Sequence, residues 1–226
     1  MDLSIVIVNY GSGRLVKACV ASIRRSPPSA AYEVIVIDNA SPDDSAELLA
    51  TEVPGIRFFP QQENLGLAKG VNIGIAEAHG EFILTLNPDV IVLNHAIVRL
   101  LEFARAHPKA AVVAGQLINP NGSVQDSCFR FYTPGTILAR RTPFGFLPAG
   151  KHSLAGALMR EYDRTAPKPV DWVLGACMLV RRSAVEAVGQ MDPRFFLYFE
   201  DMDWCRRFWG AGFETWYVPS ARFAHY

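Results

Sequence analysis

The strongest constraint on the fold is an alternation of apolar runs and amphipathic stretches through the first 106 residues. Short apolar runs typical of buried strands occupy residues 3–8, 33–37, 56–59 and 82–86. The stretches between them, and the stretch 94–106, carry apolar residues at helical spacing. Strands that alternate with helices in this way form a mostly parallel sheet. The sequence therefore predicts an α/β fold of the nucleotide-binding type, with helices on both faces of a central sheet.

The run 82–86 ends abruptly in polar residues, Asn87, Pro88 and Asp89. Because Pro88 cannot donate to a sheet, the strand stops there and Asp89 is held just past its carboxyl end. Ligands of open α/β sheets bind at that edge, and a carboxylate on a rigid support suits a divalent cation that carries phosphates. The alternative is a turn that caps the following helix. Asp38 lies at the end of the strand 33–37, and its alternative role is that of an ordinary turn residue after a strand.

Two further helices carry local signals. Ser41 is expected to cap the helix that continues to Thr51. The helix after Asn64 has the buried stripe Leu67, Val71 and Ile75, yet it contains Gly70 and Gly74, which each cost about 1 kcal/mol relative to Ala. Such glycines indicate close packing against the sheet or a ligand. Lys69 and Asn72 lie beside the stripe, on a flank that can face the strand ends.

Composition limits the class of protein. The chain has 226 residues, half of them hydrophobic, which is enough for one large domain with a full core. Lys plus Arg and Asp plus Glu both total 22, so no nucleic-acid partner is expected. The cysteines form no CxxC pair and are expected to be buried hydrophobes in a reducing compartment. No signal peptide or membrane span is evident. The expected location is the cytoplasm, either free or peripheral at the inner face of the plasma membrane.

Regularity is expected to fail within residues 119–170, a stretch rich in Pro, Gly and isolated aromatic residues. It carries seven cations against three acids: Arg130, Arg140, Arg141, Lys151, Arg160, Arg164 and Lys168 against Asp126, Glu161 and Asp163. Long irregular inserts often recognise a second substrate, and the basic excess favours an anionic acceptor such as a lipid diphosphate. The alternative is a solvated loop without a binding role.

Beyond this insert, residues 173–180 and 213–218 are predicted strands, and three acids lie close together at the start of a predicted helix between them: Glu200, Asp201 and Asp203. The helix dipole should favour their ionised forms. Successive helix positions turn by roughly 100°, so the three carboxylates cannot all face one crevice. Arg207 follows Asp203 by four residues, which makes Asp203 the structural acid. The other two remain candidates for a general base, unless all three only complement the dipole.

Six motifs occur in an order that resembles one family. They are Val8-Asn9-Tyr10, Asp38-Asn39-Ala40-Ser41, Asn64-Leu65-Gly66 with Asn72-Ile73-Gly74, Leu86-Asn87-Pro88-Asp89, Gly175-Ala176 and Phe199-Glu200-Asp201. Together they resemble the motifs of glycosyltransferase family 2, which has a GT-A fold, and in particular those of its rhamnosyltransferase-like branch. The resemblance covers essentially the whole chain except residues 119–170. The resemblance implies inverting transfer, leaning towards rhamnose, from a nucleotide-diphosphate sugar to a saccharide or lipid-linked acceptor, assisted by Mg²⁺ or Mn²⁺. Within a single domain, residues 1–115 would bind the donor, and residues 116–226 the acceptor.

The resemblance also implies roles for single residues. The donor-binding set would be Asn9, Tyr10, Asp38, Asn39, Asn64, Lys69, Asn72 and Asn87. In it, Asn9, Tyr10 and Asp38 would line the nucleoside pocket, and Lys69 and Asn72 would approach the ribose or diphosphate. Metal ligands would be Asp89, Asn87 and His225. Asp201 matches the general base, with Glu200 beside it.

Two departures from the family pattern matter. Asn87 stands where the family has an acid, so the metal site is expected to be weaker. The sequence stops one residue after His225, where similar proteins continue, which indicates a truncated chain.

Two rival functions stay open. A sugar-nucleotide nucleotidyltransferase would need a longer basic loop than residues 11–14, and a non-catalytic nucleotide-sugar-binding protein would tolerate Asn87.

Overall fold

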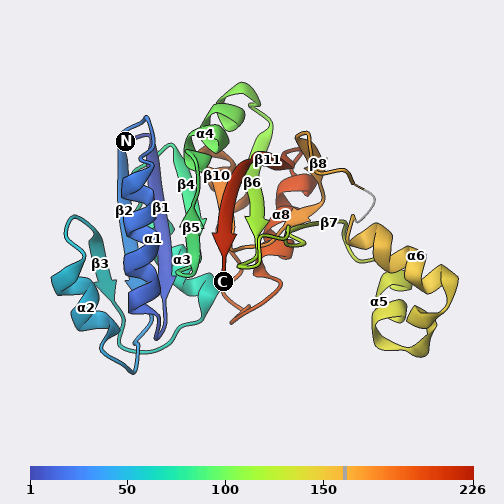
Figure 1. Cartoon of the computed structure of the whole chain (residues 1–226), viewed down its shortest axis with the longest axis horizontal. Coiled ribbons are helices and arrows are strands. Elements are labelled where there is room, and N and C mark those ends of the chain that lie inside the picture. Colours follow the sequence, from blue (N-terminus) through green and yellow to red (C-terminus); the bar gives the residue numbers. More distant parts are fainter. Residues whose placement is uncertain (160–161) are drawn as a thin grey trace.

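The computed structural model describes residues 1–159 and 162–226, which form a twisted sheet between two layers of helices (Figure 1). The strands of this sheet are β1 (Leu3–Asn9), β2 (Tyr32–Asp38), β3 (Arg57–Pro60), β4 (Phe82–Leu86), β5 (Val90–Val92), β6 (Ala110–Ile118), β8 (Lys168–Val170), β10 (Cys177–Arg181) and β11 (Glu214–His225). Within the described residues their order is β3-β2-β1-β4-β10-β6-β11-β5, and β8 pairs with β11.

The predicted α/β class with a mainly parallel sheet is confirmed. Strand β1 lies between β2 and β4 and is parallel to both, and β3 extends this set. Strand β10 runs antiparallel between β4 and β6, and β6 pairs in parallel with β11. Strand β6 is buried along its whole length but was not predicted, because Gly115 and Gln116 interrupt its apolar run.

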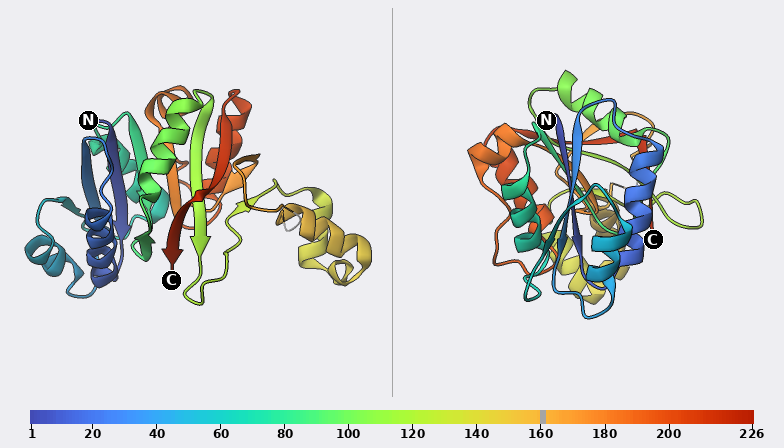
Figure 2. Two further views of the ribbon diagram at one scale, coloured as in Figure 1. Left: turned by 45° about the horizontal axis from the view of Figure 1, so that its top comes forward. Right: turned by 90° about the vertical axis from the view of Figure 1, so that its left-hand side faces the viewer.

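Helices cover both faces of the sheet, as the sequence predicts (Figure 2). The helices on one face are α1 (Gly13–Arg25), α2 (Ser45–Glu52) and α4 (Ala96–Ala106). Those on the other are α3 (Leu67–Glu77), α7 (Arg182–Val188) and α8 (Glu200–Gly210). Alternate residues of β1 serve the two cores, since Ile5 and Ile7 belong to the first and Val6 to the second. The four cysteines are buried and free, as expected.

Three local expectations are wrong. Ser41 does not cap α2, which begins four residues later; its hydroxyl instead donates to Asp38 Oδ1 at 2.6 Å, because that carboxylate is the stronger acceptor. The strand expected at 173–180 is split into β9 (Trp172–Val173) and β10, with a break at residues 174–176. The last strand, β11, runs far beyond residue 218.

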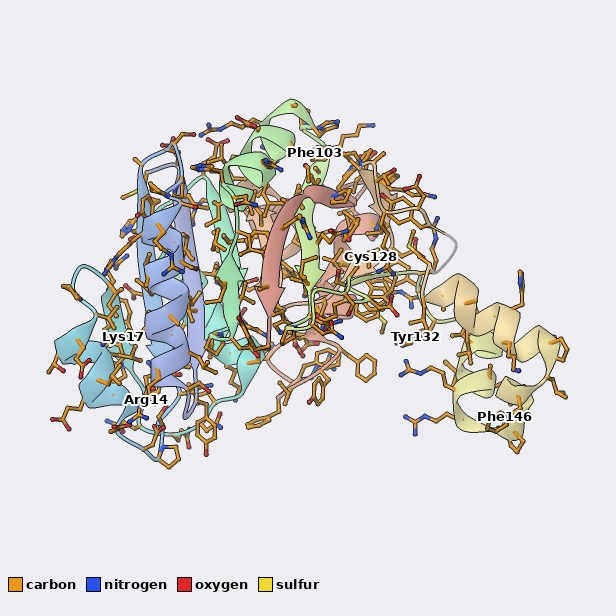
Figure 3. All side chains as sticks on the ribbon, viewed as in Figure 1. Arg14, Lys17, Phe103, Cys128, Tyr132 and Phe146 are labelled. Carbon is orange, nitrogen blue, oxygen red and sulfur yellow. The ribbon has the colours of Figure 1, made fainter. Side chains whose placement is uncertain are left out.

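The insert is more regular than predicted. After β7 (Cys128–Phe129), which pairs with β9, it forms α5 (Pro134–Arg141), a 3₁₀ helix (Pro143–Phe146) and α6 (Pro148–Ala157). We call residues 132–158 the arm, because they project from the body, with Tyr132 at the junction and Phe146 near the far end (Figure 3). Both helices begin with Pro at their first position, a start signal that our sequence analysis overlooked. Arg160 and Glu161, counted in the charge balance, lie outside the described residues.

Close packing explains the glycines of α3. A Cβ atom at Gly74 would lie 2.2 Å from Val6 Cγ1, and one at Gly70 would lie 2.8 Å from Val8 Cγ1. The helix can approach β1 this closely only without side chains at these positions. Gly156 in α6 offers a contrast, because a Cβ atom there would meet no atom within 4 Å.

We therefore expect opposite effects from the same substitution at these two sites. Gly74→Ala should lower the free energy of unfolding by about 1–3 kcal/mol, since overpacking outweighs the gain in helix propensity. Gly156→Ala should raise it by up to about 1 kcal/mol. Urea denaturation followed by circular dichroism measures both changes. A stabilised Gly74→Ala variant would contradict the packing argument.

Candidate active site

A cleft of about 480 Å³ lies where β4, β10 and α8 meet. Its lining includes Asn87, Glu200, Asp201 and His225 together with Gly175 and Ala176. These residues come from four separate parts of the sequence, and each belongs to a motif or role that the sequence analysis named. The fold thus brings two of the three predicted metal residues, Asn87 and His225, and the predicted base to one cavity.

The break at residues 174–176 builds the centre of this cleft. The Gly175 N–H donates to Asp201 Oδ2 at 2.8 Å, and the Ala176 carbonyl accepts from the Asn87 N–H at 3.0 Å. Gly175 also lies against Asp201, since a Cβ atom at position 175 would be in van der Waals contact with the Asp201 side chain, at 3.4 Å. The backbone of the break therefore serves α8 and the end of β4 at the same time.

Asp201 is buried, with 6% of its surface exposed. Its Oδ2 accepts from Gly175, and its Oδ1 accepts from the Met202 N–H at 2.7 Å. Burial raises the pKa of this carboxyl, and the two N–H groups only partly offset that effect. We expected the helix dipole to dominate and favour the ionised form; that expectation is wrong, because desolvation is the larger effect.

Glu200 is buried even more deeply, and its Oε2 has no hydrogen-bond donor within the described part of the chain. Burial raises the pKa of this carboxyl, and the neighbouring charge of Asp201 raises it further. Asp203 differs from both, because its Oδ2 accepts from Arg207 Nε at 2.8 Å. The prediction that Asp203 forms a structural ion pair is confirmed.

Asp89 and His225 meet at the opposite edge of the cleft, where β5 and β11 pair. The imidazole Nε2 lies 3.5 Å from Asp89 Oδ1, which is buried and has no hydrogen-bond donor among the described residues. The other ring nitrogen, Nδ1, lies 2.8 Å from the side-chain oxygen of Gln125 and donates to it. A cation placed between Nε2 and the carboxylate oxygen would bind both atoms.

The donor set at this edge is small. Among the described residues, no three His, Cys, Asp or Glu side chains cluster closely enough to hold a metal ion alone. Asp89 and His225 supply one oxygen and one nitrogen, and Asn87 lines the same cleft. Mg²⁺ is commonly held by one or two carboxylates plus substrate phosphates, so these residues fit a cation whose coordination a diphosphate completes.

Asn9 and Asp38 form a hydrogen-bond network at the ends of β1 and β2. The Asn9 amide donates to Asp38 Oδ1 at 2.7 Å and to Ser41 Oγ at 3.0 Å. Asp38 Oδ2 accepts from the Ser41 N–H at 3.1 Å, so Ser41 completes the network. Tyr10 is half exposed beside it. Sequence analysis missed Ser41 as a site residue, although its spacing from Asp38 is the signal of a local turn.

The remaining predicted donor residues lie around the start of α3. The Asn39 amide donates to the Gly66 carbonyl at 3.0 Å, and Asn64 Oδ1 accepts from the Gly66 N–H at 3.0 Å. Lys69 is exposed in the first turn of α3. The side chain of Asn72 bonds both backbone groups of Met191, at 2.8 and 3.0 Å, so it holds the residue-191 loop. Ligand contacts for these four residues stay predictions.

Three large apolar residues that the sequence analysis did not predict as site residues form one wall of the cleft. They are Leu197, Tyr198 and Phe199, and each is about half or more exposed. Tyr198 and Phe199 have φ values of 72° and 71°, a conformation unfavourable for bulky residues, which places a strained loop at a binding surface. Gly66 contacts this loop: the Leu67 N–H donates to the Phe196 carbonyl at 2.7 Å, and a Cβ at Gly66 (φ 82°) would lie 2.5 Å from that oxygen.

Comparison with known proteins decides the family. The model of the family described as Glycosyl transferase family 2 matches residues 4–189. The chain belongs to this family. Among curated relatives, it is 30% identical to the N-acetylglucosaminyl-diphospho-decaprenol L-rhamnosyltransferase of Mycobacterium tuberculosis, over 99% of this chain and 76% of that protein. It is 25% identical to the rhamnosyltransferase WbbL of Escherichia coli, over 98% of this chain and 82% of that protein.

Two solved structures establish that this family-2 glycosyltransferase has the GT-A fold. GalNAc-T7 with UDP, GalNAc and Mn²⁺ superposes with a TM-score of 0.72 at 17% identity, over 100% of this chain and 44% of that one. The mannosyltransferase PcManGT of Pyrobaculum calidifontis, in complex with GDP-Man and Mn²⁺, gives 0.68 at 15% identity, over 99% and 56%. The chain thus spans about half the length of both.

Proposed function

We propose that this family-2 glycosyltransferase moves a sugar from a nucleotide-diphosphate donor to an acceptor hydroxyl with inversion, using Asp201 as the base. The observation that carries the proposal is the position of Asp201 in one cleft with Asn87 and His225. An inverting transfer needs a base on one face of the sugar and charge neutralisation at the leaving diphosphate on the other. One cleft offers groups for both tasks.

Each residue has a defined task in this reaction. Asp201, held by Gly175, takes the proton from the acceptor hydroxyl while that oxygen bonds to the anomeric carbon and the bond to the diphosphate breaks. Asp89 and His225, with Asn87, would hold the Mg²⁺ or Mn²⁺, which neutralises charge on the departing diphosphate. Asn9, Tyr10 and Asp38 receive the nucleoside. Rhamnose is the donor sugar that the names of the two rhamnosyltransferase relatives favour.

The metal assignment predicts that nucleoside diphosphate binding depends on a divalent cation. Isothermal calorimetry should give much tighter binding with Mn²⁺ than with EDTA. Asp89→Ala should remove this difference, and Asn87→Ala should reduce it.

Gln125→Ala should weaken metal affinity by roughly 10- to 100-fold, because His225 loses the partner that orients its ring. Glu52→Ala, which removes an exposed acid on α2, is the control. Equal affinity with and without metal in the unmutated protein would refute the assignment.

The base assignment predicts a specific kinetic loss. Asp201→Asn should lower kcat by about 10²- to 10⁴-fold while donor affinity stays unchanged. Since burial raises the pKa of Asp201, the unmutated enzyme should lose kcat/KM as pH falls, at pH values above the usual range of an aspartate. This acidic limb should vanish from the residual rate of Asp201→Asn.

The same assay distinguishes the neighbouring acid and the rival reaction. A normal rate for Asp201→Asn, with loss of activity in Glu200→Gln, would mean that Glu200 is the base. The released product is also decisive, because transfer releases a nucleoside diphosphate and nucleotidyl transfer releases pyrophosphate. Binding of donor without turnover on any acceptor would instead favour a non-catalytic protein.

We further propose that the acceptor is lipid-linked and that the arm contacts the membrane that carries it. No described helix is long and apolar enough to span a bilayer, but the arm exposes several large apolar side chains: Ile137, Leu138, Phe146 and Leu147. Three cations of the arm, Arg140, Arg141 and Lys151, form no ion pair within the described residues. Exposed apolar residues beside unpaired cations suit an anionic lipid surface.

This contact should be measurable by sedimentation with vesicles. The unmutated protein should pellet with vesicles of anionic phospholipid and much less with neutral ones, and salt should weaken the binding. Leu147→Glu should reduce the pelleted fraction, while Val124→Glu, an exposed apolar position outside the arm, should leave it unchanged. Pelleting that is indifferent to lipid charge and to Leu147→Glu would contradict the proposal.

A further inference from the structure

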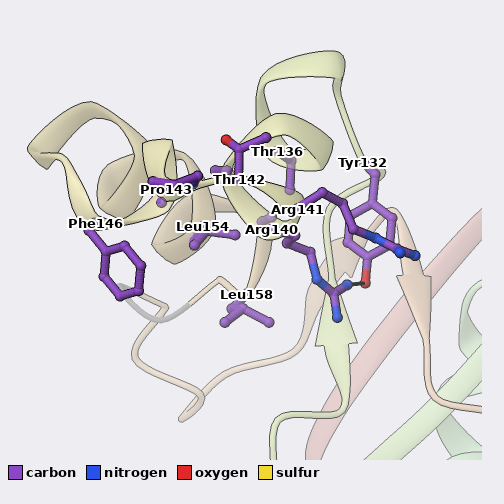
Figure 4. A pocket seen from close by; sticks show the side chains of 12 residues that line it. Tyr132, Thr136, Arg140, Arg141, Thr142, Pro143, Phe146, Leu154 and Leu158 are labelled. Carbon is purple, nitrogen blue, oxygen red and sulfur yellow. Dashed lines mark hydrogen bonds between the residues drawn. The ribbon is translucent and has the colours of Figure 1, made fainter.

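The arm encloses a cavity of its own. This cavity measures about 630 Å³, within the usual range of small-molecule sites, and lies between α5, the 3₁₀ helix and α6. Its lining is mostly apolar and includes Ala139, Pro143, Phe146, Leu154 and Leu158 (Figure 4). An apolar hollow of this size suits a flexible hydrocarbon chain.

One end of the arm cavity is polar and lies next to the candidate active-site cleft. Tyr132 and Arg140 line both spaces. The Arg140 guanidinium donates to the Tyr132 hydroxyl and lies 5.0 Å from the centre of its ring. Figure 4 shows these two residues at one end of the cavity and Phe146 at the other, with Leu154 and Leu158 between them. Tyr132 also meets Phe199 of the cleft in a T-shaped contact, at 6.5 Å between ring centres.

Charge distinguishes this end from the rest of the insert. The sequence has no acid between Asp126 and Glu161. Arg130 and Arg164 are paired with Asp171 and Asp126, at 2.9 and 2.6 Å. Arg140 and Arg141, in contrast, have no acidic partner in the part of the chain that the structure describes, and both line the arm cavity. Guanidinium groups bind phosphate oxygens well, and two of them line the same cavity here.

We propose that the arm cavity binds the isoprenoid chain of a lipid-diphosphate acceptor, with its diphosphate on Arg140 and Arg141. The order of groups along such a lipid is sugar, diphosphate and chain. The order of spaces is the cleft with Asp201, the shared Arg140, and the apolar cavity. A molecule seated in this direction presents its sugar hydroxyl to the base. The assignment rests on the proposed function, since it names the substrate class of the same cleft.

Direct binding of isoprenyl diphosphates tests this site without any turnover. Farnesyl diphosphate should bind the protein at least about 100-fold more tightly than inorganic pyrophosphate, because each buried CH₂ group adds roughly fourfold in affinity and burial of about three or four such groups already gives this factor. Leu154→Glu places a charge in the cavity and should abolish most of this difference. Arg140→Ala should weaken both ligands. Ala149→Glu is the matched control, because it adds the same charge at an exposed position of α6 and should change neither affinity.

The outcomes separate this site from the rest of the assignment. Mn²⁺-dependent binding of a nucleoside diphosphate, measured on every variant, reports that the body is folded. Equal affinities for farnesyl diphosphate and pyrophosphate would overturn the lipid site and leave sugar transfer to a soluble saccharide unaffected. Equal losses of farnesyl diphosphate affinity in Leu154→Glu and Ala149→Glu would overturn the lipid site too. The isoprenoid chain would then lie on the outside of the arm. Tight farnesyl diphosphate binding without any sugar transfer would refute the proposed function and keep the site.

Discussion

The hydrogen bond from the Gly175 N–H to Asp201 is the interaction on which the cleft depends. A strand that continued through residues 174–176 would use that N–H in the sheet and leave Asp201 Oδ2 without its donor. The break instead turns one backbone donor to α8 and one carbonyl, that of Ala176, to Asn87. These three residues thereby link Asp201, the proposed base, to the end of β4 through backbone hydrogen bonds.

The buried polar groups of the cleft are satisfied unevenly. Asp201 accepts two backbone hydrogen bonds, whereas Glu200 Oε2 and Asp89 Oδ1 lack a donor among the described residues. A buried acceptor left without a partner costs about 1–3 kcal/mol. Both such atoms belong to residues of the candidate site, one beside the proposed base and one in the proposed metal-binding set. A bound acceptor or cation would remove these costs, so ligands should stabilise the folded chain as well as react in it.

Much of the scaffold could be predicted from local sequence. The apolar run of β4 and the proline that ends it, the glycines of α3 and the pair Asp203–Arg207 each act within a few residues, and each behaves as predicted. The features that the sequence analysis did not predict depend on contacts between residues that are far apart in the sequence. Gln125 reaches His225 across 100 residues of chain, and the break at 174–176 exists only because β4 and α8 approach it from elsewhere in the sequence. Desolvation of Asp201 is also a property of the packed molecule, which is why the dipole argument gave the wrong direction.

The contact between Gly66 and the 196–199 loop has a consequence for engineering this enzyme. The backbone at Gly66 is left-handed, and the Phe196 carbonyl fills the space that a side chain would need. The N-terminal and C-terminal parts of the chain are therefore not independent modules at this point. A chimera that receives the acceptor loop of a relative must take residues 64–67 from the same parent, because a mismatched pair would either collide or lose the bond from Leu67.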